Sequence, residues 1–139
     1  VTPNAFEAAH LTGIDTATVE GAHAAASALL RMGPRIAVVT GVPGRSGIAT
    51  VAASADGAWY IETPVFARPS HGAGDLFAAL LLGHLLKGLS LAVALSNAVS
   101  AVYGLLAFAP ARPAVDLPLV EGQDLLLEPP EIFNPQRLA

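Results

Sequence analysis

The first part of the chain carries the apolar spacing and the end signals of two helices. Pro3 biases Thr2 toward extended geometry and Asn4 is a good N-cap, so the pattern predicts a strand end that breaks into a helix at Asn4. A second helix is predicted from about residue 16 to residue 32, because its apolar residues recur at intervals of three and four. The pair Gly33-Pro34 ends it.

Extended structure is predicted for the next segments. Residues 35–40 form a short run rich in β-branched residues, which is typical of a buried parallel strand. Residues 48–54 and 58–66 also favour extended structure, and Asp56-Gly57 between them is a hairpin-turn signal. We therefore expect one buried strand followed by a hairpin.

The second part of the chain is predicted to hold two apolar helices and an irregular tail. Small residues at 72–75 follow a loop at 67–71 and lead into an apolar helix over 76–86. A second helix is predicted over 91–108, with Ser90 as its cap, and the proline-rich tail contributes one short apolar piece at 125–127. This order of helix, strand, hairpin, helix and helix belongs to an α/β layered fold.

The segment 88–111 contains no charged residue and is long enough to cross a bilayer as a helix. Four polar residues interrupt it, and the flanks carry no aromatic belt beyond Tyr103 and Phe108. A helix that is apolar on most faces is also what a large core requires, so we expect a core helix and no membrane contact.

Composition and charge narrow the classes of function. The chain has 139 residues, of which 53% are hydrophobic and 13% charged, which excludes a disordered tail and suits one domain. Its net charge of −4 has the wrong sign for binding to nucleic-acid phosphates. The absence of cysteine excludes disulfides, thiolate catalysis and cysteine-based metal sites.

The segment Gly72-Ala73-Gly74-Asp75 is the most informative candidate for chemistry. Small residues let backbone N–H groups approach an anion, and a helix N-terminus adds about half a positive charge. Asp75 admits two interpretations: a carboxylate that favours the helix dipole, or a base that takes a hydroxyl proton during phosphoryl transfer. The segment thus predicts a cradle for a phosphate or an oxyanion.

Three further parts of the sequence bear on metal or nucleotide binding. Asn4 and Glu7 have the spacing of a capping box, and the same oxygens could organise Mg²⁺. Thr40 and Gly41 end a predicted strand, where ligands of open α/β sheets bind. The glycine-rich stretch 41–47 lacks the Gly-Lys-Ser/Thr ending of a phosphate loop.

The histidines and serines point to no metal centre or hydrolase. The four histidines show no metal-binding spacing, and the serine at position 46 lacks the Gly-x-Ser-x-Gly context of a hydrolase. His71 directly precedes the glycine segment, where it could donate to a phosphate, and Arg68 precedes the same segment. The histidines are otherwise interpreted as surface or packing residues, at positions 10, 23 and 84.

With these pieces in order, the sequence resembles the ribokinase-like superfamily and, within it, the pyridoxal kinases. Residues 2–8 resemble the segment whose Asn-x-x-Glu motif orders the magnesium and phosphate site, and Gly72-Ala73-Gly74-Asp75 resembles the Gly-x-Gly-Asp anion hole. The strand over 36–40 resembles the one whose end contacts ATP, and the ending 128–133 is similar to pyridoxal kinase tails.

The resemblance implies a three-layer α/β/α sandwich, of which residues 1–139 form only the C-terminal, nucleotide-binding half. It implies that Asp75 is the catalytic base and contacts the substrate hydroxyl, and that Gly72, Ala73 and Gly74 form the anion hole. Thr2, Asn4, Glu7, Thr40 and Gly41 would join Gly72 and Gly74 in binding ATP, with Mg²⁺ held by Asn4 and Glu7 through water.

The implied reaction is phosphorylation of the 5′-hydroxymethyl group of pyridoxal and related vitamers, in a cytoplasmic enzyme that is a homodimer at full length. A requirement for a monovalent cation stays open. Two alternatives also stay open: a hydroxymethylpyrimidine kinase of the same superfamily, and a non-catalytic nucleotide-binding fragment.

Overall fold

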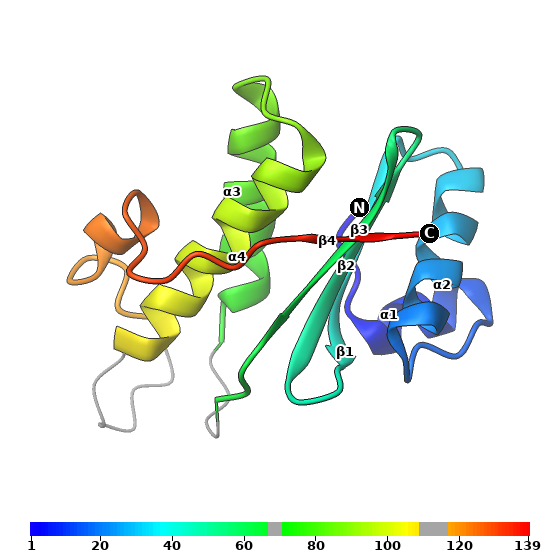
Figure 1. Ribbon diagram of the computed structural model, residues 1–139, viewed down its shortest axis with the longest axis horizontal. Coiled ribbons are helices and arrows are strands. Elements are labelled where there is room, and N and C mark those ends of the chain that lie inside the picture. Colours follow the sequence, from blue (N-terminus) through cyan, green and yellow to red (C-terminus); the bar gives the residue numbers. More distant parts are fainter. Residues whose placement is uncertain (67–70, 109–116) are drawn as a thin grey trace. The chain divides into compact units, whose positions relative to one another are not determined.

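The computed structural model describes residues 1–66, 71–108 and 117–139, which belong to two compact units (Figure 1). The first unit comprises Val1–Pro64 and Pro135–Ala139, and the second comprises Val65–Asn134. Each unit is described by itself below.

The first unit is a four-stranded sheet with two helices. Its elements are α1 (Ala5–Thr12), α2 (Val19–Arg31), β1 (Ile36–Pro43), β2 (Ile48–Ser54), β3 (Gly57–Thr63) and β4 (Gln136–Leu138). The strands follow one another in the order β1-β2-β3-β4, and each neighbouring pair is antiparallel. The expected hairpin is thus confirmed as β2–β3. β4 lies in the tail that was expected to be irregular.

A parallel strand was expected at β1, but β1 pairs with β2 in the antiparallel direction. A turn of four residues joins β1 to β2, and so short a connection can join only antiparallel neighbours. β1 does have a parallel neighbour on its other side, because the amide of Val38 donates to the carbonyl of Val1 (2.9 Å) and that of Thr40 to the carbonyl of Pro3 (3.0 Å). The first residues therefore continue the sheet, as the sequence predicts for a strand end.

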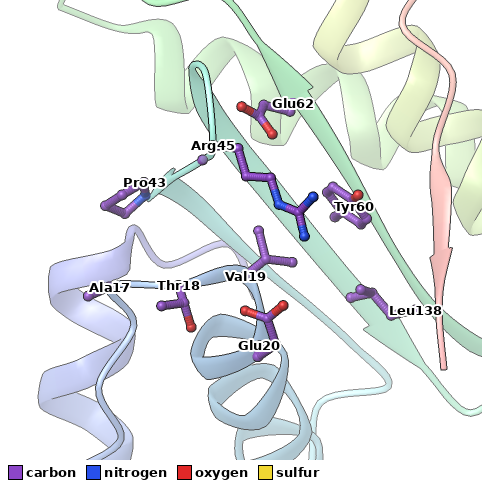
Figure 2. A pocket seen from close by; sticks show the side chains of 10 residues that line it. Ala17, Thr18, Val19, Glu20, Pro43, Arg45, Tyr60, Glu62 and Leu138 are labelled. Atoms are coloured by element: carbon purple, nitrogen blue, oxygen red, sulfur yellow. The ribbon is translucent and has the colours of Figure 1, made fainter.

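A hollow of about 400 Å³ lies between the start of α2, the β1–β2 turn and β3 (Figure 2). Val19 and Leu138 give it an apolar floor, and the charged side chains of Glu20, Arg45 and Glu62 line it. It contains none of the residues that the sequence singles out for catalysis or nucleotide binding.

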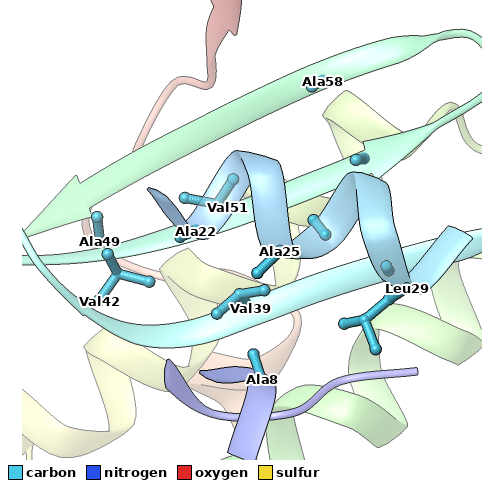
Figure 3. Close-up of a cluster of buried hydrophobic side chains, with 12 residues drawn as sticks. Ala8, Ala22, Ala25, Leu29, Val39, Val42, Ala49, Val51 and Ala58 are labelled. Atoms are coloured by element: carbon cyan, nitrogen blue, oxygen red, sulfur yellow. The ribbon is translucent and has the colours of Figure 1, made fainter. Parts of the chain in front are cut away.

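The core of the first unit lies between the sheet and its two helices (Figure 3). Alanines at 22, 25 and 26 let α2 approach the strands closely, and Leu29 fills the end of the same face. Opposite them, Val39 of β1 and Val51 of β2 are fully buried and stand directly across from each other in the sheet. The predicted helix 16–32 is confirmed, with Thr18 as N-cap.

The second unit consists of two long helices and a returning tail. Helices α3 (Ala73–Leu86) and α4 (Leu91–Phe108) contact each other and are joined by a short connection. A 3-10 helix, η1 (Gln123–Leu126), packs on α4. The expected cap of α4 is present, since the hydroxyl of Ser90 accepts from the amide of Val93 (3.4 Å).

Helix α4 is long and apolar enough to cross a membrane by length and composition, and it is the one such helix within the described residues. Two of its polar residues are used inside the unit. The hydroxyl of Ser96 donates to the carbonyl of Phe133 (2.7 Å), and the hydroxyl of Ser100 accepts from the amide of Phe133 (2.9 Å). Ser100 is fully buried, and these bonds hold the tail on α4 as expected for a core helix.

Candidate phosphate and nucleotide site

The carboxyl end of β1 carries a β-bulge at the two residues that the sequence assigns to the nucleotide. Val39 pairs with Val51 and Val42 pairs with Ala49, so Thr40 and Gly41 together stand opposite the single residue Thr50. Gly41 has a φ of 71°, which favours glycine. The bulge interrupts the regular pairing, which resumes at Val42, and Gly41 is exposed while Thr40 is half-buried.

The first turn of α1 lies beside this bulge. Asn4 forms a parallel bridge with Thr40, and α1 begins at the next residue. The side-chain oxygen of Asn4 accepts from the amide of Glu7 (2.9 Å), and Oε2 of Glu7 accepts from the amide of Asn4 (2.9 Å). The predicted capping box is confirmed, and it holds both oxygen-bearing side chains at the end of β1.

The capping box leaves oxygens for a hard cation. Asn4 and Glu7 are both exposed, and within the described residues the second carboxylate oxygen, Oε1 of Glu7, makes no hydrogen bond. Residues 1–66, 71–108 and 117–139 contain no group of three or more histidine, cysteine or acidic side chains that could hold a metal directly. The donor set therefore fits Mg²⁺ that keeps most of its waters and binds through one carboxylate and substrate phosphates.

Helix α3 opens on the predicted anion cradle. The sequence predicted that the helix starts at residue 76, whereas it begins at Ala73 with Gly72 as N-cap at φ 88°. The reason is that Gly72 supplies the carbonyl that accepts from the amide of Leu76 (2.9 Å), so the small residues form the first turn itself. Ala73, Gly74 and Asp75 thus occupy positions N1 to N3 of α3.

This first turn is open to a ligand. Gly72 provides no side chain to cap it, so the leading amides have no intrahelical partner. Among the described residues, a Cβ added at Gly74 would meet no atom within 4 Å apart from its own helix backbone, and Asp75 is exposed in the same turn. Free amides, positive helix-dipole charge and a carboxylate thus share one short segment, which suits a transferring phosphoryl group.

The remaining predicted positions are less informative. Thr2 is half-buried between the two residues whose carbonyls bind β1, and His71 is exposed immediately before Gly72. Arg68 lies outside the described residues. Sequence reasoning missed Glu62, which bonds to the β1–β2 turn across a separation of 16 residues. No local pattern could have linked the two.

Comparison with known proteins identifies the family to which the sequence is similar. Residues 1–115 match the sequence family described as phosphomethylpyrimidine kinase. The pyridoxal kinase PdxY of Rubrobacter xylanophilus is 42% identical over 144 residues, which cover 100% of this chain and 50% of that protein. The chain spans about half the length of the curated relatives it matches.

Solved structures show the same fold. The pyridoxal kinase from Leishmania donovani in complex with ADP superposes with a TM-score of 0.87 at 19% identity, over 99% of this chain and 51% of that one. A putative phosphomethylpyrimidine kinase from Bacteroides thetaiotaomicron, in a crystal form with pyridoxal, superposes with a TM-score of 0.83 at 23% identity, over 99% and 52%. The predicted ribokinase-like α/β class is confirmed.

Proposed function

The chain belongs to the phosphomethylpyrimidine kinase family, and we propose that it forms the C-terminal, nucleotide-binding half of an ATP-dependent pyridoxal kinase. The reaction would transfer the γ-phosphoryl group of ATP to the 5′-hydroxymethyl group of pyridoxal or a related vitamer. The observation that carries the proposal is the first turn of α3, whose N-cap Gly72 makes no side-chain hydrogen bond, with Asp75 at its third position. The relative at 42% identity, a pyridoxal kinase, supports this choice of substrate.

In this proposal Asp75 accepts the proton of the substrate hydroxyl while the oxygen of that hydroxyl bonds to the γ-phosphorus of ATP. The bond from that phosphorus to the bridging oxygen breaks, and ADP leaves. The amides of the first turn of α3, at Ala73 and Gly74 after the Gly72 cap, stabilise the negative charge on the transferred group. Asp75 acts mainly by position, because positioning and charge stabilisation supply most of the catalysis in phosphoryl transfer.

The groups at the end of β1 would bind the nucleotide and its metal ion. Glu7, oriented by Asn4, would hold Mg²⁺ through water, and bound Mg²⁺ would neutralise charge on the phosphate oxygens. Thr40 and Gly41 would contact ATP at the bulge, where neither has a regular partner on β2, and Thr2 would complete this edge. The similar structure of pyridoxal kinase from Leishmania donovani, solved in complex with ADP, supports an adenine nucleotide as the ligand.

The test is Asp75→Asn in the complete enzyme. Asparagine keeps the size of the side chain and removes the proton acceptor, so kcat should fall by about 10²–10⁴ while the affinity for ATP is retained. Turnover is followed by the formation of pyridoxal 5′-phosphate, and ATP affinity by calorimetry. Exposed Asp56, in the β2–β3 turn, supplies the control Asp56→Asn, which should leave both unchanged. Near-normal turnover of Asp75→Asn would overturn the proposal.

A second candidate is hydroxymethylpyrimidine kinase, which the description of the matching family favours. The same catalytic groups would serve, since both substrates present a hydroxymethyl group on an aromatic ring. Comparing kcat/KM for pyridoxal and for the hydroxymethylpyrimidine separates the two. The cytoplasmic location, the homodimer and any monovalent cation stay predictions of the resemblance.

A further inference from the structure

The β1–β2 turn is held by a carboxylate from β3. Oε1 of Glu62 accepts from the amide of Ser46 (2.6 Å) and from its hydroxyl (3.1 Å). Figure 2 shows Glu62 on β3 beside the turn that carries Arg45. The amide of Ser46 is the main cause of a lowered pKa of Glu62, and the amides of Arg45 and Gly47 add to it. The carboxylate is therefore ionised at neutral pH and binds the turn by charge-assisted hydrogen bonds.

The turn is also shaped to lie against β3. It is closed by a hydrogen bond from the amide of Gly44 to the carbonyl of Gly47 (3.0 Å). A Cβ at Gly47 would clash with the carbonyl oxygen of Thr63, the residue after Glu62. The close approach thus requires glycine at position 47. The backbone contact with Thr63 and the carboxylate of Glu62 therefore hold the same four-residue turn, 44–47.

Only two paired residues separate this turn from the bulge. Pro43 pairs with Ile48 and Val42 pairs with Ala49, and Gly41 of the bulge comes next. Glu62 itself stands across from Ala49 on β3, so it lies on the strand pair that borders the bulge. A shift of the turn would be passed through these pairs to Gly41 and Thr40, which have no regular partners on β2. On the other side of β1, the bond from the amide of Thr40 to the carbonyl of Pro3 resists such a shift, whereas Gly41 has only the turn side to hold it.

We propose that Glu62 is a positioning residue for the nucleotide: by holding the β1–β2 turn on β3, it fixes the backbone of Thr40 and Gly41. This inference rests on the proposed function, because it takes those two residues as nucleotide contacts. It assigns a role to a side chain outside the set of residues proposed to contact substrate, nucleotide or metal.

The test compares three variants of the complete enzyme. Glu62→Ala removes both hydrogen bonds, and Glu62→Gln keeps an acceptor oxygen without the charge. Glu20→Ala is the matched control, since Glu20 is exposed and lines the same hollow, and within the described residues its side chain makes no hydrogen bond to the turn. The readouts are KM for ATP, kcat, and hydrogen exchange of the amides in the turn.

Loss of both hydrogen bonds of an exposed carboxylate corresponds to about three- to tenfold in an equilibrium constant, because solvent replaces much of each bond. We expect Glu62→Ala to raise KM for ATP by about this factor with kcat nearly unchanged, and to speed exchange of the Ser46 amide. Glu62→Gln should lie between Glu62→Ala and the parent. Glu20→Ala should match the parent in all three readouts.

Faster exchange with an unchanged KM would overturn the positioning role, and unchanged exchange would overturn the clamp itself. A kcat that falls as much as kcat/KM, with KM constant, would also contradict the inference. If Glu62→Ala does not fold, the same comparison of Glu62→Gln with the parent decides. A parent enzyme that phosphorylates neither pyridoxal nor the pyrimidine refutes the proposed function, whereas the exchange measurement still tests the clamp.

Discussion

Gly74→Ala in the complete enzyme should raise stability and lower activity together. Gly74 is the second residue of α3, and a Cβ there would meet no other atom of the described residues within 4 Å, its own helix backbone aside. No packing among the described residues therefore requires glycine, although glycine costs about 0.5–1 kcal/mol relative to alanine in a helix. In the proposed mechanism the phosphoryl group approaches this same first turn, so we expect a side chain at Gly74 to obstruct it.

The magnitude follows from these two effects. Replacing glycine by alanine should stabilise the fold by up to about 1 kcal/mol, which raises Tm by roughly 2 °C in an enzyme about twice the length of this chain. A methyl group in the approach path weakens the bonds from the amides to the transferred group. A loss of about 1.4–3 kcal/mol there lowers kcat by about ten- to 150-fold.

Helix α3 also supplies the matched control. Gly83 lies inside the same helix, and a Cβ there would likewise meet nothing within 4 Å in the part of the chain that the structure describes. Gly83→Ala should raise Tm by a similar amount and leave kcat unchanged. The measurements are thermal unfolding and steady-state kinase assays on the parent and both variants. Equal kcat values for Gly74→Ala and Gly83→Ala would refute the reasoning, because the open space at Gly74 would then have no use in catalysis.

Two further predictions concern the first unit. Glu7→Gln keeps an acceptor for the capping box and removes the charge, so the Mg²⁺ concentration for half-maximal activity should rise about tenfold while Tm falls by only a few degrees; a Mg²⁺ titration with thermal melts checks this. Because the folded pKa of Glu62 is lowered, the stability it contributes is present above the ordinary glutamate pKa and is lost as the pH falls through the folded value. Hydrogen exchange of Ser46, corrected for the intrinsic rate, should show constant protection from pH 5 to 8 and decline below about pH 4; a decline centred near neutrality would contradict the assignment.

Local chemistry explains which parts of the fold the sequence could predict. The cap at Asn4, the end of α2 at Gly33-Pro34 and the bounds of α4 depend on residues within a few positions of one another. The Gly-Ala-Gly-Asp segment was recognised for the same reason, although its helix begins three residues earlier than predicted. Glycine has a low helix propensity, so the sequence pattern did not predict helix at residues 73–75, which form the first turn after the N-cap Gly72.

The parts that were missed depend on distant pairing. β4 has three residues, and it exists because Gln136 and its neighbours pair with β3, where the hydroxyl of Tyr60 donates to the side chain of Gln136 (2.6 Å). The contact of Glu62 with the β1–β2 turn likewise requires β2 and β3 to be in register. Neither leaves a trace in local composition, since tertiary pairing decides both.

The bulge in β1 makes this part of the sheet more sensitive to the number of residues in the strand than to their identity. Ala37 and Val39 face the α2 core before it, and Val42 faces the same core after it, although strict alternation would place Gly41 there. Deleting either Thr40 or Gly41 would restore unbroken alternation and give a more regular sheet. We expect a relative one residue shorter here to keep the fold and to lose the nucleotide contacts proposed for Thr40 and Gly41.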